Sequence, residues 1–268
     1  MQIAGLQKIS LLDYPDKISS VVFTQGCNFI CPFCHNPELT GMRGSSLNAS
    51  HNPPLIPPLL RGGAEKLISP LVSGEADHLY INEKDFFKHL DERKGFIDGV
   101  CITGGEPLMQ KDIADFIKKV KERGLLVKLD TNGSYPDKLR NLIKQKILDY
   151  IAMDIKNTFS NKYSEASGVN VDLNQIKKSI KLIMDSGLGY EFRTTVVKEL
   201  HKKENILEIA EYINGARKYV LQKFEIRDKI MDRSFINYSS ITTEEALELK
   251  KECSQFVEKV ELRGWGES

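Results

Sequence analysis

The sequence predicts an α/β fold in which six parallel strands alternate with helices and form an open, partial (β/α)6 barrel with an inserted Pro/Gly-rich loop. Short apolar runs alternate with amphipathic stretches over most of the 268 residues, as in repeated β–α units. The number of such runs is six rather than eight, so the barrel is expected to stay incomplete. The polar motifs directly follow several of these runs, at the carboxyl edge where a parallel sheet holds its site.

The apolar runs and the amphipathic stretches give the expected elements in chain order. The predicted strands are 18–24, 98–102, 125–130, 149–155, 190–197 and 219–226. The predicted helices are 83–93, 110–123, 137–146, 173–186, 203–215 and 243–258.

Capping chemistry supports two of the helix boundaries. Asp172 is expected to cap the helix 173–186, and Gly187 to end it in a left-handed turn. Thr242 and Glu245 have the spacing of a capping box at the start of the last helix.

The segment 41–78 interrupts the alternation. It contains two Pro-Pro pairs and a Gly-Gly pair, so neither a helix nor a central strand can pass through its middle. We interpret it as a loop inserted into a single domain that spans 1–268. Extended structure at Pro53-Pro54 and Pro57-Pro58 would also suit the groove of a partner, but a tolerated, mobile insertion is the favoured interpretation.

Composition excludes some broad classes of function. Lys plus Arg (38) nearly equals Asp plus Glu (37), so no global field favours nucleic acid or a membrane surface as a partner. No apolar run approaches the roughly 18 residues that span a bilayer, and we expect a soluble, cytoplasmic protein.

The cysteine count is odd, which favours metal ligation in a reducing compartment over a disulfide framework. Cys101 and Cys253 lie in apolar surroundings and are predicted to be core residues.

Three cysteines follow the strand 18–24 with the spacing Cys27-x3-Cys31-x2-Cys34. Three thiolates on a tight loop can hold three corners of a cubane [4Fe–4S] cluster and leave the fourth iron open to an amine and a carboxylate. The alternative is a structural zinc site with His35 or a distant cysteine as fourth ligand. Zinc is less favoured because the chain has no second close cysteine pair, and because His35 directly follows Cys34.

The segment Cys27-x3-Cys31-x-Phe33-Cys34 resembles the signature of the radical S-adenosylmethionine (SAM) superfamily. The context from Gly5 to Glu38 resembles glycyl-radical-enzyme activating proteins, and within them the activating proteins of anaerobic ribonucleoside-triphosphate reductase. The segments GVCITGGEPLMQ, LDTNG and YIAMDIKN extend this resemblance over nearly the whole chain except 41–78. It implies a radical SAM partial barrel and makes Phe33 and His35 candidates for contact with a cofactor.

Gly104, Gly105 and Glu106 follow the second predicted strand. The two glycines let the backbone approach a ligand closely, and Glu106 can accept hydrogen bonds from an ammonium group. The resemblance implies that this ammonium is the methionine amine of SAM. A generic glycine turn is the alternative.

Two further strand ends carry candidate SAM contacts. Asp130, Thr131 and Asn132 close the third strand, and the resemblance places this segment against the sulfonium end and ribose of SAM, although Asn-Gly also makes a turn by itself. Asp154 and Lys156 are two residues apart and so share one face of the fourth strand, where a salt-bridged barrel lining is the alternative.

Arg193 lies within the fifth strand, where a guanidinium group that enters a barrel needs an anionic partner. The methionine carboxylate of SAM is one candidate. Glu191, two residues away on the same face, is the other, and both remain open.

The resemblance implies an enzyme that cleaves SAM with one electron from a [4Fe–4S] cluster and transfers the radical to a glycine of anaerobic ribonucleoside-triphosphate reductase. A flavodoxin or ferredoxin is the implied electron donor. The alternatives are an activase of another glycyl-radical enzyme, such as pyruvate formate-lyase, a small-molecule radical SAM reaction, and a zinc-binding module that is not an enzyme. The absence of a second cysteine cluster before Gly104 argues against activases that carry additional clusters.

Overall fold

The structure has eight strands, and their order in the sheet follows the sequence from β1 to β8. The structure, a computed structural model, describes residues 1–41, 81–226 and 230–266. The chain divides into two compact units, Met1–Asn28 with His35–Lys128 and Phe29–Cys34 with Leu129–Ser268. Strand β4 (Leu126–Thr131) lies at the division.

The first unit holds the start of the sheet. β1 (Ile3–Ser10) pairs antiparallel with β2 (Ser19–Thr24), and β2 pairs parallel with β3 (Gly99–Gly104). All six residues of β2 are buried, as a central strand requires. The carboxyl ends of β2 and β3 therefore lie side by side, with Thr24 paired to Gly104.

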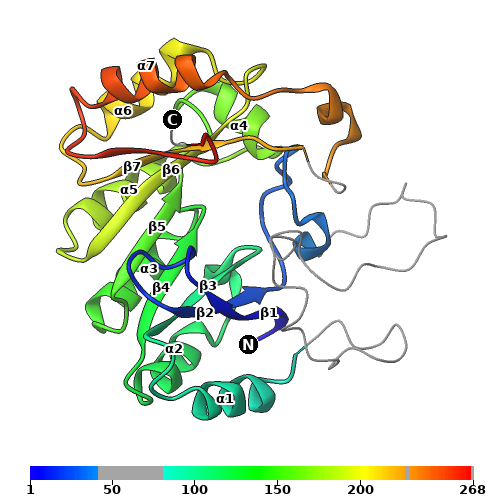
Figure 1. Cartoon of the computed structure of the whole chain (residues 1–268), viewed down its shortest axis with the longest axis vertical. Helices are drawn as coiled ribbons and strands as arrows, with labels where there is room; N and C mark the ends of the chain where they lie inside the picture. Colours follow the sequence, from blue (N-terminus) through cyan, green and yellow to red (C-terminus); the bar gives the residue numbers. More distant parts are fainter. Residues whose placement is uncertain (42–80, 227–229, 267–268) are drawn as a thin grey trace. The chain divides into compact units, whose positions relative to one another are not determined.

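Two helices and two short 3-10 turns complete the described part of this unit. Helices α1 (Glu83–Glu92) and α2 (Ile113–Lys121) lie together, and the Phe116 ring is 5.1 Å from that of Phe86 and 5.3 Å from that of Phe87 (Figure 1). The turns are η1 (Pro37–Thr40) and η3 (Pro107–Met109). Because both turns follow strand ends, they shape the loops at the carboxyl edge.

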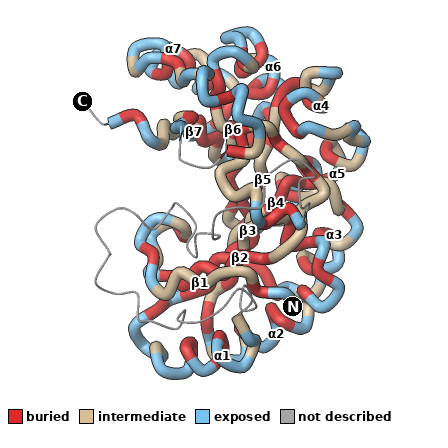
Figure 2. Tube along the Cα trace, turned by 90° about the vertical axis from the view of Figure 1, so that its right-hand side faces the viewer, coloured by how far each residue is buried: buried red, intermediate tan, exposed pale blue. Residues whose placement is uncertain are grey.

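The second unit continues the sheet with four parallel strands. They are β5 (Tyr150–Asp154), β6 (Gly189–Val196), β7 (Tyr219–Lys223) and β8 (Val260–Arg263). The helices of this unit are α3 (Pro136–Lys144), α4 (Asn161–Ser167), α5 (Leu173–Met184), α6 (Lys203–Tyr212) and α7 (Thr243–Cys253), with the 3-10 turn η4 (Arg233–Asn237). Each long helix buries one stripe and exposes the other (Figure 2).

Strand register gives the sheet of the second unit two different faces. Asp154, Arg193, Val220 and Glu261 are paired across β5, β6, β7 and β8, so their side chains share one face. The row one residue earlier consists of Met153, Phe192, Tyr219 and Val260 and is buried throughout. One face therefore supplies core packing, and the other carries most of the charge.

The structure confirms the α/β partial-barrel fold and all six predicted strands, and adds β1, β8 and α4, which were not predicted. The last helix ends at Cys253 rather than at 258, and α2 begins at Ile113 rather than at 110 because the 3-10 turn η3 precedes it. Asp172 caps α5, Gly187 has a left-handed φ of 74°, and Thr242 forms its capping box with Glu245.

Two sequence predictions about the chain's organisation have different outcomes. Cys101 and Cys253 are fully buried in the core, as predicted. The segment 41–78 lies, except for Gly41, outside the described residues, and the single domain over 1–268 stays a prediction. In the described ranges, no helix is both long enough and apolar enough to cross a membrane.

Candidate functional site

In the first unit, the loop that carries Cys27 is joined by backbone hydrogen bonds to the turn after β3. The Gly26 amide donates to the Leu39 carbonyl at 2.7 Å. The Glu106 amide donates to the Gly26 carbonyl at 2.8 Å, and the Gly105 amide donates to the Thr24 carbonyl at 2.9 Å. The two predicted motifs of this unit, around Cys27 and around Glu106, are thus brought together by the pairing of β2 with β3.

Both glycines of the turn are required by backbone contact. Gly104 has a φ of 108°, and a Cβ on it would lie 2.4 Å from the Thr24 nitrogen. A Cβ on Gly105 would lie 2.0 Å from the Gly26 carbonyl oxygen. These contacts are shorter than any real Cβ contact, so a side chain at either position would separate the two loops.

Glu106 is completely buried, although a carboxylate is rarely found in this situation without partners. Its Oε1 accepts a hydrogen bond from the Leu108 amide at 3.0 Å and so caps η3. The cap fixes the carboxylate in one orientation at the carboxyl end of β3. A fixed, buried anion of this kind suits an ammonium ligand.

In the second unit, the loop Phe29–Cys34 carries the other two cysteines of the motif. The Cys34 amide donates to the Cys31 carbonyl at 2.9 Å, which closes a tight turn between them. The amides of Met231 and Asp232 donate to the carbonyls of Cys34 and Pro32, at 3.1 and 3.0 Å. Phe33 is buried and its ring lies 6.4 Å from that of Phe235.

None of the five cysteines forms a disulfide bond with another described residue. Cys31 is buried, and Cys27 and Cys34 are partly exposed. The motif is divided between the two units, since Cys27 and His35 belong to the first. Among the described residues, no three His, Cys, Asp or Glu side chains are grouped as a metal site.

A network of four charged side chains joins the carboxyl ends of β4 and β5 to the middle of β6. Arg193 donates from Nε to Asp154 Oδ1 at 2.7 Å and from Nη1 to Asp130 Oδ2 at 3.0 Å. Lys156 Nζ donates to Asp154 Oδ2 at 3.0 Å. The network therefore balances two carboxylates with two cations, and the predicted salt-bridged lining is present.

These ion pairs keep Asp154, Lys156 and Arg193 charged. Burial alone would raise the pKa of Asp154, but Arg193 and Lys156 outweigh it and hold this pKa well below its usual range. Burial alone would lower the pKa of Lys156, but Asp154, and after it Cys31, raise this pKa above its usual value. The charge of a Cys31 thiolate thus favours the protonated form of Lys156.

Glu191, the other predicted partner of Arg193, forms its hydrogen bonds elsewhere. It is almost completely buried and accepts from the Tyr150 hydroxyl at 3.3 Å, while Lys218 Nζ lies 3.2 Å from its Oε2. Arg263 Nη1 completes the cluster at 3.5 Å. Arg193 therefore forms its ion pairs with Asp130 and Asp154.

The segment after β4 is a turn stabilised by its own side chains. Thr131 Oγ1 accepts from the Gly133 amide at 3.1 Å, and Asn132 Oδ1 accepts from the Ser134 amide at 3.0 Å. Gly133 has a φ of 78°. The turn interpretation of these residues is confirmed, and their contact with a ligand remains a prediction.

Two residues that the sequence analysis missed support Lys156. His201 is buried, and the Val197 amide donates to its Nδ1 at 3.1 Å, so its Nε2 carries the proton that is donated to the Lys156 carbonyl at 2.8 Å. Tyr163 of α4 is fully buried near the same lysine. Neither residue belongs to a recognisable motif, although the Ser160 cap and Gly168 were signals for α4 itself.

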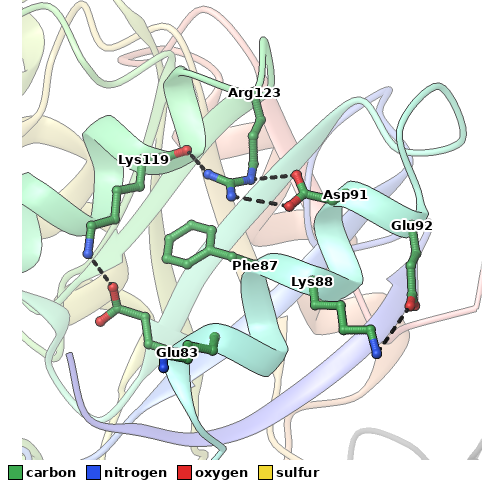
Figure 3. Close-up of a pocket in the computed structure, with 8 residues that line it drawn as sticks. Glu83, Phe87, Lys88, Asp91, Glu92, Lys119 and Arg123 are labelled. Carbon is green, nitrogen blue, oxygen red and sulfur yellow. Dashed lines mark hydrogen bonds and ion pairs between the residues drawn. The ribbon is translucent and has the colours of Figure 1, made fainter.

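A shallow surface groove of about 650 Å³ runs between α1 and α2 (Figure 3). Its walls are joined by ion pairs, Lys119 to Glu83 at 2.6 Å and Arg123 to Asp91 at 2.8 Å. The Arg123 guanidinium also lies 4.4 Å from the centre of the Phe87 ring. Because helix side chains rather than strand ends line it, this groove is a packing feature of α1 and α2 and is not the candidate site.

Comparison with known proteins agrees with this geometry. Residues 21–214 match the family model of the radical SAM superfamily. A Methanocaldococcus jannaschii protein, provisionally named a glycyl-radical enzyme activating enzyme, is 31% identical over 97% of this chain and 95% of its own length. The pyruvate formate-lyase-activating enzyme of Clostridium pasteurianum is 28% identical over 81% of this chain and 77% of its own length.

Solved structures share the fold at low sequence identity. The crystal structure of Streptococcus suis SuiB bound to S-adenosylmethionine has a TM-score of 0.62 and 14% identity. The match covers 91% of this chain and 50% of SuiB, so this chain spans about half the length of that protein.

Proposed function

Because the chain belongs to the radical SAM superfamily and, within it, to the glycyl-radical enzyme activating enzymes, we propose that it generates a glycyl radical on anaerobic ribonucleoside-triphosphate reductase. The observation that supports this partner is a sequence resemblance to the activating proteins of that reductase. It is carried by the residues from Gly5 to Glu38 and by the segments GVCITGGEPLMQ, LDTNG and YIAMDIKN. Membership in the superfamily implies a [4Fe–4S] cluster and SAM. When bound, they supply a 5′-deoxyadenosyl radical through one-electron cleavage of the sulfonium bond.

Three thiols would hold the cluster, and their chemistry fits this role. Cys27, Cys31 and Cys34 form no disulfide bonds among the described residues, and thiolates are the ligands that iron–sulfur clusters use. The Lys156 ammonium compensates part of the negative charge that such a ligand carries at Cys31. The loop is also fixed by the backbone of residues 231 and 232, which is typical of a site with a defined geometry.

Glu106 would bind the amine of SAM. Its carboxylate is buried, and the cap on η3 holds it in place, so no reorganisation is needed when the ligand arrives. Gly104 and Gly105 let this turn pack directly against the backbone of Thr24 and Gly26, which holds Glu106 beside the loop that carries Cys27.

The charged network and the turn after β4 would bind other groups of SAM. Asp130, Thr131 and Asn132 would lie along its sulfonium end and ribose. Lys156 and Arg193 offer cations for its carboxylate, and Asp154 keeps both of them oriented. The network orients the ligand and replaces its hydration shell with fixed charges.

A pyruvate formate-lyase type of partner is the second candidate. The C. pasteurianum relative, which is named for pyruvate formate-lyase, covers most of this chain. The chemistry at the cysteine loop would be the same, and only the partner would differ. An external low-potential donor, a flavodoxin or a ferredoxin, would supply the electron in either case.

The test incubates the anaerobically reconstituted chain with dithionite, SAM and one candidate reductase or lyase at a time. The expected result is a glycyl-radical signal in electron paramagnetic resonance with anaerobic ribonucleoside-triphosphate reductase. A signal only with pyruvate formate-lyase would select the second candidate. A chain that holds one zinc ion and no acid-labile sulfide would refute both.

A matched pair of cysteine variants controls this experiment. Cys31→Ala is expected to abolish cluster assembly and the formation of 5′-deoxyadenosine. Cys253→Ala removes a buried thiol of the same unit and is expected to keep both. Equal iron content in the two variants would contradict the assignment of Cys31 as a ligand.

A further inference from the structure

Lys156 lies just beyond the end of a strand, where the sheet no longer holds its backbone. The register of β5 and β6 ends with the pair Asp154 and Arg193, and the Ile155 amide donates to the Arg193 carbonyl at 2.8 Å. β5 ends at Asp154, while β6 continues to Val196. The position of Lys156 therefore depends on other contacts.

Two buried side chains supply these contacts. Thr194 Oγ1 donates to the Ile155 carbonyl at 2.9 Å and accepts from the Tyr219 hydroxyl at 2.8 Å. His201 Nε2 lies 2.8 Å from the Lys156 carbonyl. Two successive carbonyl groups are thus each held by a side chain in place of a strand partner.

The imidazole of His201 is fixed by the turn that carries it. The amides of Leu200 and His201 donate to the Val197 carbonyl at 3.0 and 2.8 Å, which closes this turn. The Val197 amide donates to Nδ1 of the ring at 3.1 Å. Because the Val197 carbonyl already accepts two amide hydrogens, Nδ1 is the acceptor and Nε2 carries the proton. A donor with a fixed position thus faces the Lys156 carbonyl.

The residue held in this way also supplies a cation to the charged network. Lys156 Nζ lies 3.0 Å from Asp154 Oδ2, and 16% of the lysine side chain is exposed. The backbone at Lys156 determines where its side chain starts, so a rotation of this peptide group would move the ammonium relative to Asp154. The hydrogen bond from His201 therefore fixes the ammonium as well as the carbonyl.

We propose that His201 is a positioning residue that acts through the Lys156 carbonyl and places the Lys156 ammonium where it meets the carboxylate of SAM. The inference rests on the proposed function, in which Lys156 is a cation for that carboxylate. His201 acts through another residue, so its loss weakens the binding of SAM by misplacing a group that remains present.

The test compares His201→Asn with His201→Gln. The amide nitrogen of glutamine can take the position of Nε2 and donate to the Lys156 carbonyl, whereas that of asparagine reaches only the position of Nδ1. Each variant is reconstituted anaerobically, and its affinity for SAM is measured by equilibrium dialysis. His201→Asn is expected to bind SAM about tenfold more weakly than the wild type, and His201→Gln within about threefold of it. Equal affinities of the two variants would overturn the inference.

A double-mutant cycle with Lys156→Met distinguishes positioning from a general loss of structure. If His201 acts through the lysine ammonium, His201→Asn has little further effect on SAM affinity once that ammonium is absent. Independent structural losses would instead add, and additive losses would overturn the inference.

A second buried histidine provides the matched control. His89 of α1 is buried, and its Nε2 lies 3.1 Å from Ser20 Oγ, near the start of β2. His89→Asn is expected to bind SAM as the wild type does. A loss equal to that of His201→Asn would show that removal of any buried imidazole has this effect, which would overturn the inference.

Two outcomes separate this inference from the proposed function. If the reconstituted wild type binds no SAM, the proposed function fails first. If the wild type binds SAM and His201→Asn binds it equally tightly, the inference is overturned and the proposed function stands.

A measurement on the wild type covers the case in which the variants do not fold. Nitrogen-15 resonances of the histidine rings, recorded before reconstitution at neutral pH, report which ring nitrogen carries the proton. The expected result for His201 is a proton on Nε2. A proton on Nδ1 alone would leave nothing to donate to the Lys156 carbonyl and would overturn the inference without any variant.

Discussion

Two glycines that end helices provide a sharp test of how the cysteine loop is held. Gly168 follows α4 and Gly187 follows α5, with φ values of 71° and 74°. Alanine in this left-handed conformation costs about 1–2 kcal/mol at either position. No atom lies within 4 Å of a Cβ on Gly187, whereas a Cβ on Gly168 would be 2.0 Å from the Ile30 carbonyl oxygen.

The difference between the two variants follows from that contact. Ordinary contact begins at 3.4 Å, so Gly168→Ala must displace backbone, which is not flexible in the way a side-chain end is. The displacement breaks the hydrogen bond from Ile30 to Ser167, worth about 1 kcal/mol. We therefore expect a loss of about 3 kcal/mol for Gly168→Ala and about 1 kcal/mol for Gly187→Ala.

Urea unfolding followed by circular dichroism measures both losses, provided that the m-value stays constant. Iron content after reconstitution gives a second measure, and only Gly168→Ala is expected to reduce it, because only this change moves the loop that carries Cys31 and Cys34. Equal losses of stability and equal iron content in the two variants would refute the view that α4 supports the cysteine loop.

Three further changes test the charged and capped positions. Arg193→Met should lower the free energy of unfolding by about 3 kcal/mol at pH 7. This value is at the lower end of the usual cost of breaking a buried ion pair, because Lys156 still pairs with Asp154 in the variant. Since the folded pKa of Asp154 is depressed below its ordinary 3.8, its stabilising contribution is present above that pH and is lost as the pH falls. The cost of Arg193→Met should therefore shrink below about pH 4 in urea titrations, and a constant cost would contradict this reasoning. Glu106→Gln should keep the cap on η3 and the stability, but weaken SAM binding at least tenfold in equilibrium dialysis, and unchanged binding would exclude Glu106 as the anionic partner. Thr242→Ala should cost about 1 kcal/mol through loss of the capping box, and a loss below about 0.3 kcal/mol would show that the box contributes little.

The sequence predicted the strands that are buried on both faces and missed those at the two ends of the sheet. β2 and β5 are short apolar runs between turn residues, which is a strong signal. β1 has mostly half-buried residues and pairs on one side with β2, and β8 has only four residues, so neither forms an apolar run. Such strands are fixed by pairing with neighbours, and pairing is not visible in a local pattern.

Helix α4 was missed for a related reason. It has seven residues, most of them polar, and an isolated helix of this length has little stability of its own. Its contacts with the loop Phe29–Cys34 stabilise it, and these join segments more than 130 residues apart in the sequence.

The sequence motifs predicted which residues belong to the candidate site, but not which of their side chains pair with one another. Alternation along β6 placed Glu191 and Arg193 on one face, and on that basis either a ligand or Glu191 was an acceptable partner for the arginine. The structure pairs Arg193 with Asp154, because these two residues are opposite each other in the register of β5 and β6. Register depends on the whole sheet, so a local pattern could not decide between the partners.

The same register explains how one sheet can provide both stability and chemistry. Met153 and Phe192 face the apolar core, while Asp154 and Arg193, one residue later on each strand, face the charged side. A change in the first pair alters packing alone, whereas a change in the second alters charge balance at the candidate site as well. Because the two pairs are joined by the backbone of the same two strands, loss of core packing would also move the charges, and the geometry of the site depends on residues that never touch a ligand.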